Sequence, residues 1–77
     1  MVDKKIFASR LIECRTNLGL LSKDVADVLN VSKSAVNLYE KGKGLPSAEK
    51  LVELADLLNV SIDYLLGRTE NPNLNSK

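Results

Sequence analysis

Side chains that carry out covalent or metal chemistry are scarce in this sequence of 77 residues. Histidine is absent and Cys14 is the one cysteine, which leaves no zinc site, no Cys–His nucleophile pair and no disulfide. The sequence also lacks a glycine-rich phosphate loop, so acid–base or nucleophilic catalysis has no evident apparatus. We therefore expect a protein that is not an enzyme and needs no cofactor or metal. A lone cysteine suits a reducing compartment, and we expect the cytoplasm.

The charged side chains are divided unevenly along the chain. Residues 1–44 carry eight basic and five acidic side chains, whereas residues 45–77 carry three basic and five acidic ones. This division favours one face that attracts an anion, although an ordinary scatter of solvated charges would also produce it. Because no apolar run of about 18 residues is present, we expect no association with membranes.

Apolar residues recur at helical spacing in five segments, and strand-like alternation persists nowhere. The first segment ends before Gly19, and its expected buried face consists of Phe7, Leu11, Cys14 and Leu18. Each later segment is preceded by a serine, a preferred residue for capping a helix N-terminus. The expected caps are Ser22, Ser32, Ser47 and Ser61. We predict an all-α domain of five helices over residues 1–67 and a polar, frayed tail over residues 68–77.

Residues 22–43 contain two of these short helices, joined by the tight connection Asn30-Val31-Ser32. Such a connection forces the helices to cross steeply, as in a helix-turn-helix, whose second helix fits the major groove of DNA. In the helix that follows Ser32, Val36 and Tyr39 are expected to pack inward. The side chains then left on the outer face form a plausible set for contacting base edges: Lys33, Ser34, Asn37 and Leu38.

The order of the motifs resembles the lambda-repressor-like, or Cro/XRE-type, helix-turn-helix proteins. The shared features include Leu-Gly-Leu before the second helix, Val-Ala within it, Asn-Val-Ser at the turn, and Tyr-Glu-Lys-Gly-Lys after Val36. Pro46-Ser47 and the segment Val60–Gly67 complete a series that covers residues 6–67. The resemblance implies a compact five-helix domain that binds double-stranded DNA as a sequence-specific transcriptional regulator, of the phage or mobile-element repressor type.

The resemblance also implies roles for individual residues. Arg15 and Glu40 match an ion pair that braces the third helix against the first, and Arg15 is also expected near a DNA phosphate. Further phosphate contacts are implied at the start of the second helix and just after the third, by Ser22, Lys23, Lys41 and Lys43. The implied base readers are again Lys33, Ser34, Asn37 and Leu38.

Two positions depart from the family pattern. Leu38 stands where a long polar side chain is common, so it is expected either to contact a thymine methyl group or to be packed. Asn30 replaces the usual glycine, which the backbone accepts at modest cost because Asn tolerates positive φ.

One helix in one groove reads too few base pairs for useful specificity, so we expect a homodimer on a palindromic or pseudopalindromic operator. The expected dimer contacts come from apolar residues late in the chain: chiefly Leu57, Val60 and Tyr64, with Val52 and Leu74 as further candidates.

Two alternatives stay open, a DNA-binding antitoxin whose partner docks on the acidic half, and a protein-interaction module of the same fold. The tail would be a linker if the chain were a fragment of a longer regulator.

Overall fold

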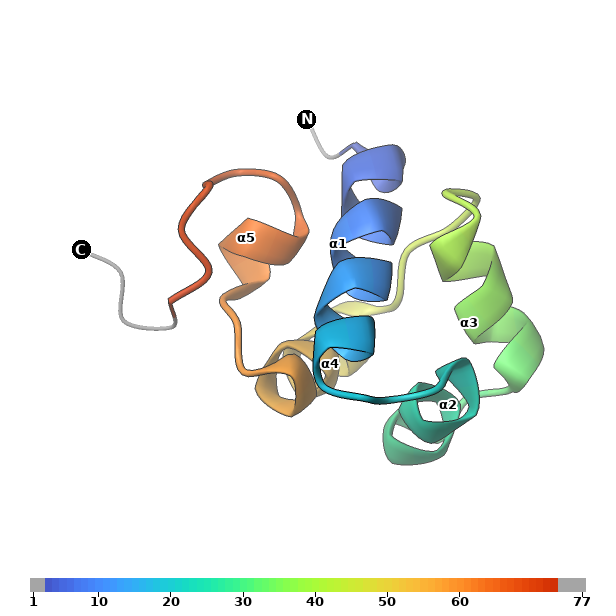
Figure 1. Ribbon diagram of the computed structural model, residues 1–77. Helices are drawn as coiled ribbons and strands as arrows, with labels where there is room; N and C mark the ends of the chain where they lie inside the picture. The colour runs from blue at the N-terminus through green and yellow to red at the C-terminus, as the bar shows by residue number, and fades with distance from the viewer. Residues whose placement is uncertain (1–2, 74–77) are drawn as a thin grey trace.

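Five α-helices account for most of residues 3–73, the part of the chain that the computed structural model describes (Figure 1). Their bounds are α1 Lys4–Asn17, α2 Ser22–Leu29, α3 Lys33–Glu40, α4 Ala48–Leu58 and α5 Ile62–Leu65. Strands are absent from this described part, and the predicted all-α fold of five helices is confirmed. None of the helices in it is long and apolar enough to cross a membrane.

Three of the four predicted serine caps are confirmed. The hydroxyls that accept a hydrogen bond from the amide three residues further on belong to Ser32, Ser47 and Ser61. The cap predicted at Ser22 is wrong, because α2 already includes Ser22 and its N-cap is Leu21. The Asp24 carboxylate accepts a hydrogen bond from the Leu21 amide at 2.8 Å. This leaves the Ser22 hydroxyl free to turn toward Glu40.

Each of the five helices contributes at least one fully buried side chain to a common core. The largest of these are Phe7, Leu11, Leu29, Leu54 and Leu65. Val36 is also fully buried and Tyr39 nearly so, and the Tyr39 ring meets Phe7 edge to face, with ring centroids 6.3 Å apart. These contacts hold α3 against α1 and confirm the inward orientation predicted for Val36 and Tyr39.

The connection between α2 and α3 adopts the backbone that the sequence predicts. Asn30 has φ 56° and ψ 46°, the left-handed conformation that ends α2. The Val31 amide then donates a hydrogen bond to the Ala26 carbonyl at 3.0 Å, and its side chain packs against the core. Ala26 is buried, and its small side chain suits this close crossing of two helices. The tight turn thereby fixes the orientation of α3 relative to α2.

The end of α1 differs from the prediction at Leu18. This residue was expected on the buried face, but 53% of it is exposed. The reason is that α1 ends at Asn17, and Gly19 takes a positive φ of 74°. The chain therefore turns away from the helix axis at Leu18, and this side chain does not continue the buried face of α1. Cys14, the preceding residue of that predicted face, is half-buried and packs against the core.

Several residues of the predicted tail contact the helices. The Arg10 guanidinium donates hydrogen bonds to the carbonyl oxygens of Tyr64 and Thr69 and lies 4.1 Å from the centre of the Tyr64 ring. The Ser61 amide donates to the Pro72 carbonyl at 2.9 Å. Residues 68–73 therefore lie against α1 and α5. The remaining tail residues, Leu74 included, lie outside the described part.

Candidate nucleic-acid interface

The outer face of α3 carries all four of the predicted base-reading side chains. Lys33, Ser34, Asn37 and Leu38 are each exposed. The opposite face of the helix is occupied by Val36 and Tyr39, which belong to the core. In Figure 1, α3 lies at one edge of the molecule, far from α5. The helix therefore presents a mixed surface of one cation, two hydrogen-bonding side chains and one aliphatic side chain.

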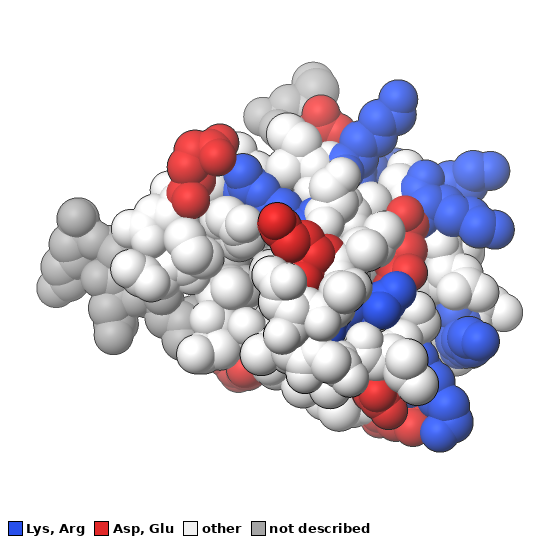
Figure 2. Space-filling model, viewed as in Figure 1, with Lys and Arg blue, Asp and Glu red and all other residues white. Residues whose placement is uncertain are grey.

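Basic side chains gather along the same edge, over α3 and the segments next to it (Figure 2). The predicted phosphate contacts Lys23, Lys41 and Lys43 are all exposed, the first at the start of α2 and the other two just after α3. Lys23 is only loosely paired with Asp27, at 3.8 Å between exposed side chains, so its charge stays accessible to an anion.

The structure adds two lysines that sequence reasoning missed. The first turn of α1 packs beside the loop after α3, since a Cβ atom placed on Gly42 would lie 3.5 Å from Lys5 Cγ and 3.7 Å from the Lys4 carbonyl oxygen. Both lysines are exposed. We call the resulting cluster the basic edge, and it consists of Lys4, Lys5, Lys41 and Lys43. In the sequence, the two lysines stand out only as members of the basic residues 1–44. That pattern does not show which segment the first turn of α1 packs against.

The expected pair of Arg15 and Glu40 is present, and a third residue shares it. Arg15 Nε donates to Glu40 Oε2 at 2.7 Å and Nη2 donates to Oε1 at 3.2 Å, while Nη1 donates to the Leu20 carbonyl. The Ser22 hydroxyl donates to the same carboxylate at 3.2–3.3 Å. Only 18% of the Arg15 side chain and 14% of the Glu40 side chain are exposed. One carboxylate thus joins α1, α2 and α3.

These contacts limit the hydrogen-bond donors that Arg15 and Ser22 can provide to a ligand. The hydrogen bonds to Glu40 raise the pKa of Arg15, against the opposing effect of burial. The Ser22 hydroxyl is already committed to the carboxylate. A phosphate at the start of α2 would therefore meet backbone N–H groups and lysine ammonium groups before the hydroxyl itself. A hollow of about 310 Å³, which we call the α2 hollow, opens at this point and is lined by Arg15, Leu21, Ser22, Lys23 and Lys33.

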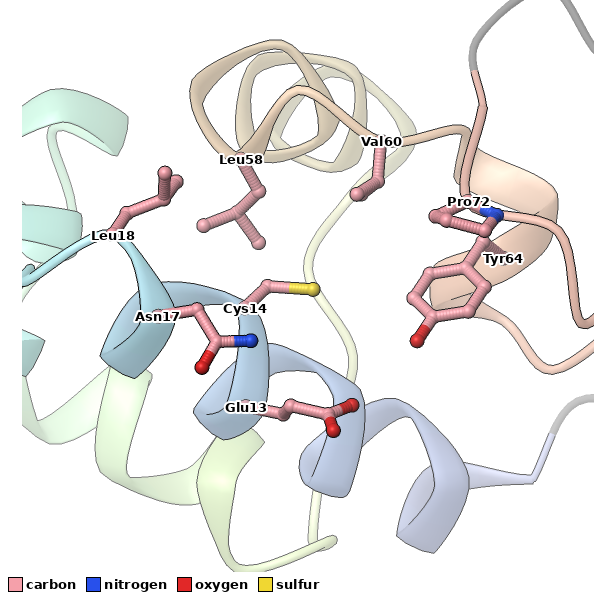
Figure 3. A pocket seen from close by; sticks show the side chains of 8 residues that line it. All are labelled: Glu13, Cys14, Asn17, Leu18, Leu58, Val60, Tyr64 and Pro72. Atoms are coloured by element: carbon pink, nitrogen blue, oxygen red, sulfur yellow. The ribbon is translucent and has the colours of Figure 1, made fainter.

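The predicted dimer residues lie on α4, on α5 and in the connection between them, and α5 is far from α3 in Figure 1. Leu57 and Tyr64 are half-buried and Val52 is 47% exposed. Val60 is only 7% exposed and belongs to the core, so it reaches the surface only at the wall of a second hollow. This hollow, which we call the α1–α5 hollow, also measures about 310 Å³ (Figure 3). Its lining consists of Glu13, Cys14, Asn17, Leu18, Leu58, Val60, Tyr64 and Pro72.

Two of the side chains that line the α1–α5 hollow, Cys14 and Tyr64, have raised pKa values, which favour their neutral forms. Burial raises the pKa of the Cys14 thiol above its ordinary value, and the nearby Glu13 carboxylate raises it further, with Arg10 acting in the opposite direction. Burial likewise raises the pKa of the Tyr64 phenol, again with Glu13 adding to the effect. The hollow is therefore apolar with an acidic margin, unlike the basic edge.

Comparison with known proteins agrees with this geometry. A model of the helix-turn-helix family matches residues 11–65, the stretch that contains α2, the turn and α3. The chain therefore belongs to the Cro/XRE-type helix-turn-helix family, a family of DNA-binding transcriptional regulators rather than enzymes.

Two relatives of this chain are connected with phages by name. It is 38% identical over 83% of its length to the SPbeta prophage-derived uncharacterized HTH-type transcriptional regulator YonR of Bacillus subtilis. It is 41% identical over 77% of its length to the cryptic phage CTXphi transcriptional repressor RstR of Vibrio cholerae. The aligned stretch spans 59% of the first relative and 53% of the second. The chain thus matches little more than half the length of these curated relatives.

Solved structures give the same fold. A transcriptional regulator from Listeria innocua superposes with a TM-score of 0.76 and 36% identity, covering 82% of this chain and 59% of that one. The restriction-modification controller protein C.AhdI from Aeromonas hydrophila superposes with a TM-score of 0.73 and 30% identity, covering 82% of this chain and 96% of that one. The second match shows that a protein of nearly the same extent adopts this arrangement.

Proposed function

We propose that this chain is a sequence-specific transcriptional repressor of the phage or mobile-element type, which acts in the bacterial cytoplasm. The observation that carries the proposal is the outer face of α3, where a helix held by the core presents exposed polar and aliphatic side chains beside a row of lysines. A helix with its side chains fits the major groove, which is about 12 Å wide. The names of the phage-connected relatives support the repressor role.

In this proposal, the residues at the interface divide into two groups. Lys33, Ser34, Asn37 and Leu38 contact base edges, which supply sequence specificity. Phosphates are bound at the α2 hollow by Lys23 and the backbone around Ser22, and along the basic edge by Lys41 and Lys43. Arg15 lines the α2 hollow but is mainly structural, because its guanidinium is already bonded to Glu40 and Leu20.

We further propose that the protein binds a palindromic or pseudopalindromic operator as a homodimer, through a surface of α4 and α5. Leu57 and Tyr64 offer partly exposed apolar surface there, and Val60 contributes only at the wall of the α1–α5 hollow. Two recognition helices would then meet half-sites about 34 Å apart on one face of the duplex. Leu57→Glu should favour the monomer in analytical ultracentrifugation, and an unchanged sedimentation coefficient would contradict this interface.

Selection of bound duplexes from a random DNA pool tests the DNA-binding proposal. We expect one enriched sequence motif, with a repeated half-site if the protein binds as a dimer. In fluorescence anisotropy, the logarithm of the binding constant should fall linearly with the logarithm of the salt concentration. A pool that shows no enrichment, together with a flat salt response, would exclude this function and favour the protein-interaction module.

A double variant, Lys33→Ala with Lys43→Ala, identifies the face that binds. It should lose at least tenfold in affinity, since each lysine contributes to a contact with DNA. Arg68→Ala is the matched control because this arginine is exposed but lies after α5, paired with Asp63 at 3.9 Å. Equal losses in the double variant and in the control would show that binding does not use the α3 face.

A further inference from the structure

Leu38 is an aliphatic side chain on an otherwise polar outer face. It is 49% exposed, and it belongs neither to the core nor to the partly buried apolar residues packed against the core. Packing of α3 is already provided by Val36 and Tyr39, with Ala35 beside them. Of the two expectations for Leu38, a packed residue or a contact with thymine, the structure removes the first.

The backbone at Leu38 is held firmly. Its carbonyl oxygen accepts a hydrogen bond from the Lys43 amide at 3.0 Å, which closes the turn that leaves α3. At 3.6 residues per turn, Leu38 lies one turn beyond Ser34 on the same stripe of the helix, and Asn37 is its neighbour on that face. The aliphatic group is therefore presented from a rigid element among side chains that form hydrogen bonds.

The chemistry of the major groove limits what Leu38 can recognise there. A leucine side chain neither donates nor accepts a hydrogen bond, so it cannot distinguish bases by their donors and acceptors. The apolar feature among the base edges is the C5-methyl group of thymine. A contact that buries this methyl group distinguishes thymine from cytosine without any hydrogen bond.

We propose that Leu38 is a specificity-determining residue that selects thymine at one position of each half-site by covering its C5-methyl group. This inference rests on the proposed DNA-binding function, because it requires α3 to lie in the major groove. Burial of one methyl group corresponds to about fourfold in affinity, or about 0.8 kcal/mol.

Deoxyuridine substitution tests the proposal, because it removes the methyl group and leaves the base-pairing edge unchanged. Duplexes carrying the site selected from the random pool are prepared with each thymidine replaced in turn by deoxyuridine. For the wild-type protein, we expect about fourfold weaker binding at one thymidine of each half-site. For Leu38→Ala, the same replacement should have no effect, since the side chain that covered the methyl group is gone.

Ser34→Ala is the matched control. It removes a neighbouring reader on the same stripe, so its overall affinity should fall while the difference between thymidine and deoxyuridine is kept. A second variant, Leu38→Gln, should shift the preference at this position toward adenine, which glutamine recognises through two hydrogen bonds. Circular dichroism verifies that each variant is folded, as expected for changes at exposed positions.

The outcomes separate this inference from the proposed function. If the protein selects a DNA sequence but no thymidine is sensitive to loss of its methyl group, Leu38 does not read thymine and DNA binding still stands. The same conclusion follows if Leu38→Ala keeps the full sensitivity of the wild type. If no sequence is enriched and binding is independent of salt, the DNA-binding function itself fails.

Discussion

Two arginines of α1 fasten two different parts of the molecule, and they do so by different means. Arg15 is bonded to the largely buried carboxylate of Glu40 and so fixes α3. Arg10 is bonded to two backbone carbonyls and the Tyr64 ring, and so fixes α5 and residues 69–70. The Glu70 carboxylate, which pairs with Arg10, belongs to a side chain that is 95% exposed, so this ion pair adds little stability.

The difference separates a charge-dependent attachment from one that depends on backbone and ring contacts. At the α3 end, removing either charge leaves the other without its partner in a poorly solvated place. At the α5 end, the counterion is dispensable, because hydrogen bonds to carbonyls and a cation–π contact remain. Four predictions sharpen this comparison, and they are ordered from the largest expected effect to the smallest.

Glu40→Ala should produce the largest loss of stability. It leaves the Arg15 guanidinium and the Ser22 hydroxyl without their shared acceptor, which we expect to cost about 3 kcal/mol in the free energy of unfolding. Urea denaturation followed by circular dichroism measures the loss. Asp56→Ala, at an exposed carboxylate of α4, is the control and should change stability by less than about 0.5 kcal/mol. Similar losses in both variants would show that the shared carboxylate has no special structural role.

Arg10→Ala should cost about 2 kcal/mol, because it removes the cation–π contact and two charge-assisted hydrogen bonds. Hydrogen exchange by NMR should show faster exchange of the Ser61 amide, whose acceptor Pro72 belongs to the segment that Arg10 holds. Glu70→Ala should leave both measurements nearly unchanged, within about 0.5 kcal/mol. A large effect of Glu70→Ala would mean that this attachment is ionic after all.

Lys4→Ala with Lys5→Ala tests whether the basic edge extends to α1. If both lysines contact phosphates, the slope of log K against log salt should fall by about 1 to 2, at about 0.9 for each lost phosphate contact. The preferred DNA sequence should stay the same, because phosphate contacts carry no direct sequence information. An unaltered slope would restrict the interface to α2, α3 and the loop that follows.

The smallest effect concerns the α1–α5 hollow at high pH. Because the pKa values of Cys14 and Tyr64 are raised in the folded protein, the unfolded chain loses these protons first. Their contribution to stability is therefore complete below the ordinary thiol pKa of 9.0 and is lost as the pH rises through the folded values. Thermal unfolding between pH 8 and 11 should show this decline, and Glu13→Gln should make it smaller. An identical decline in Glu13→Gln would show that Glu13 does not act on these groups.

The sequence predicts the helices and the orientation of α3 because these follow from local patterns. Apolar spacing, three of the serine caps and the positive φ of Asn30 are all determined within a few residues. The Ser22 cap is mispredicted because Asp24 accepts a hydrogen bond from the Leu21 amide and Glu40 accepts one from the Ser22 hydroxyl, so the N-cap of α2 lies one residue earlier than expected. Of these two acidic residues, only Asp24 is close to Ser22 in the sequence.

The remaining features depend on contacts between distant segments. The Arg10 hydrogen bonds have backbone acceptors, which any residue provides, so no residue type in the sequence marks their position. The packing of the Lys4 and Lys5 turn against Gly42 is likewise a long-range contact. For the α3 surface, residue types indicated the candidate readers, and the structure showed that Leu38 stands exposed among them.

The carboxylate shared by Arg15 and Ser22 has a consequence for the proposed binding of DNA. The hydrogen bonds to Glu40 hold α2 and α3 in a fixed relative orientation before any DNA is bound. Binding therefore orders few additional side-chain rotations, and its cost in conformational entropy is small. If the protein binds DNA as proposed, its association rate depends mainly on the attraction between the lysines and the duplex, and this rate should fall as the salt concentration rises.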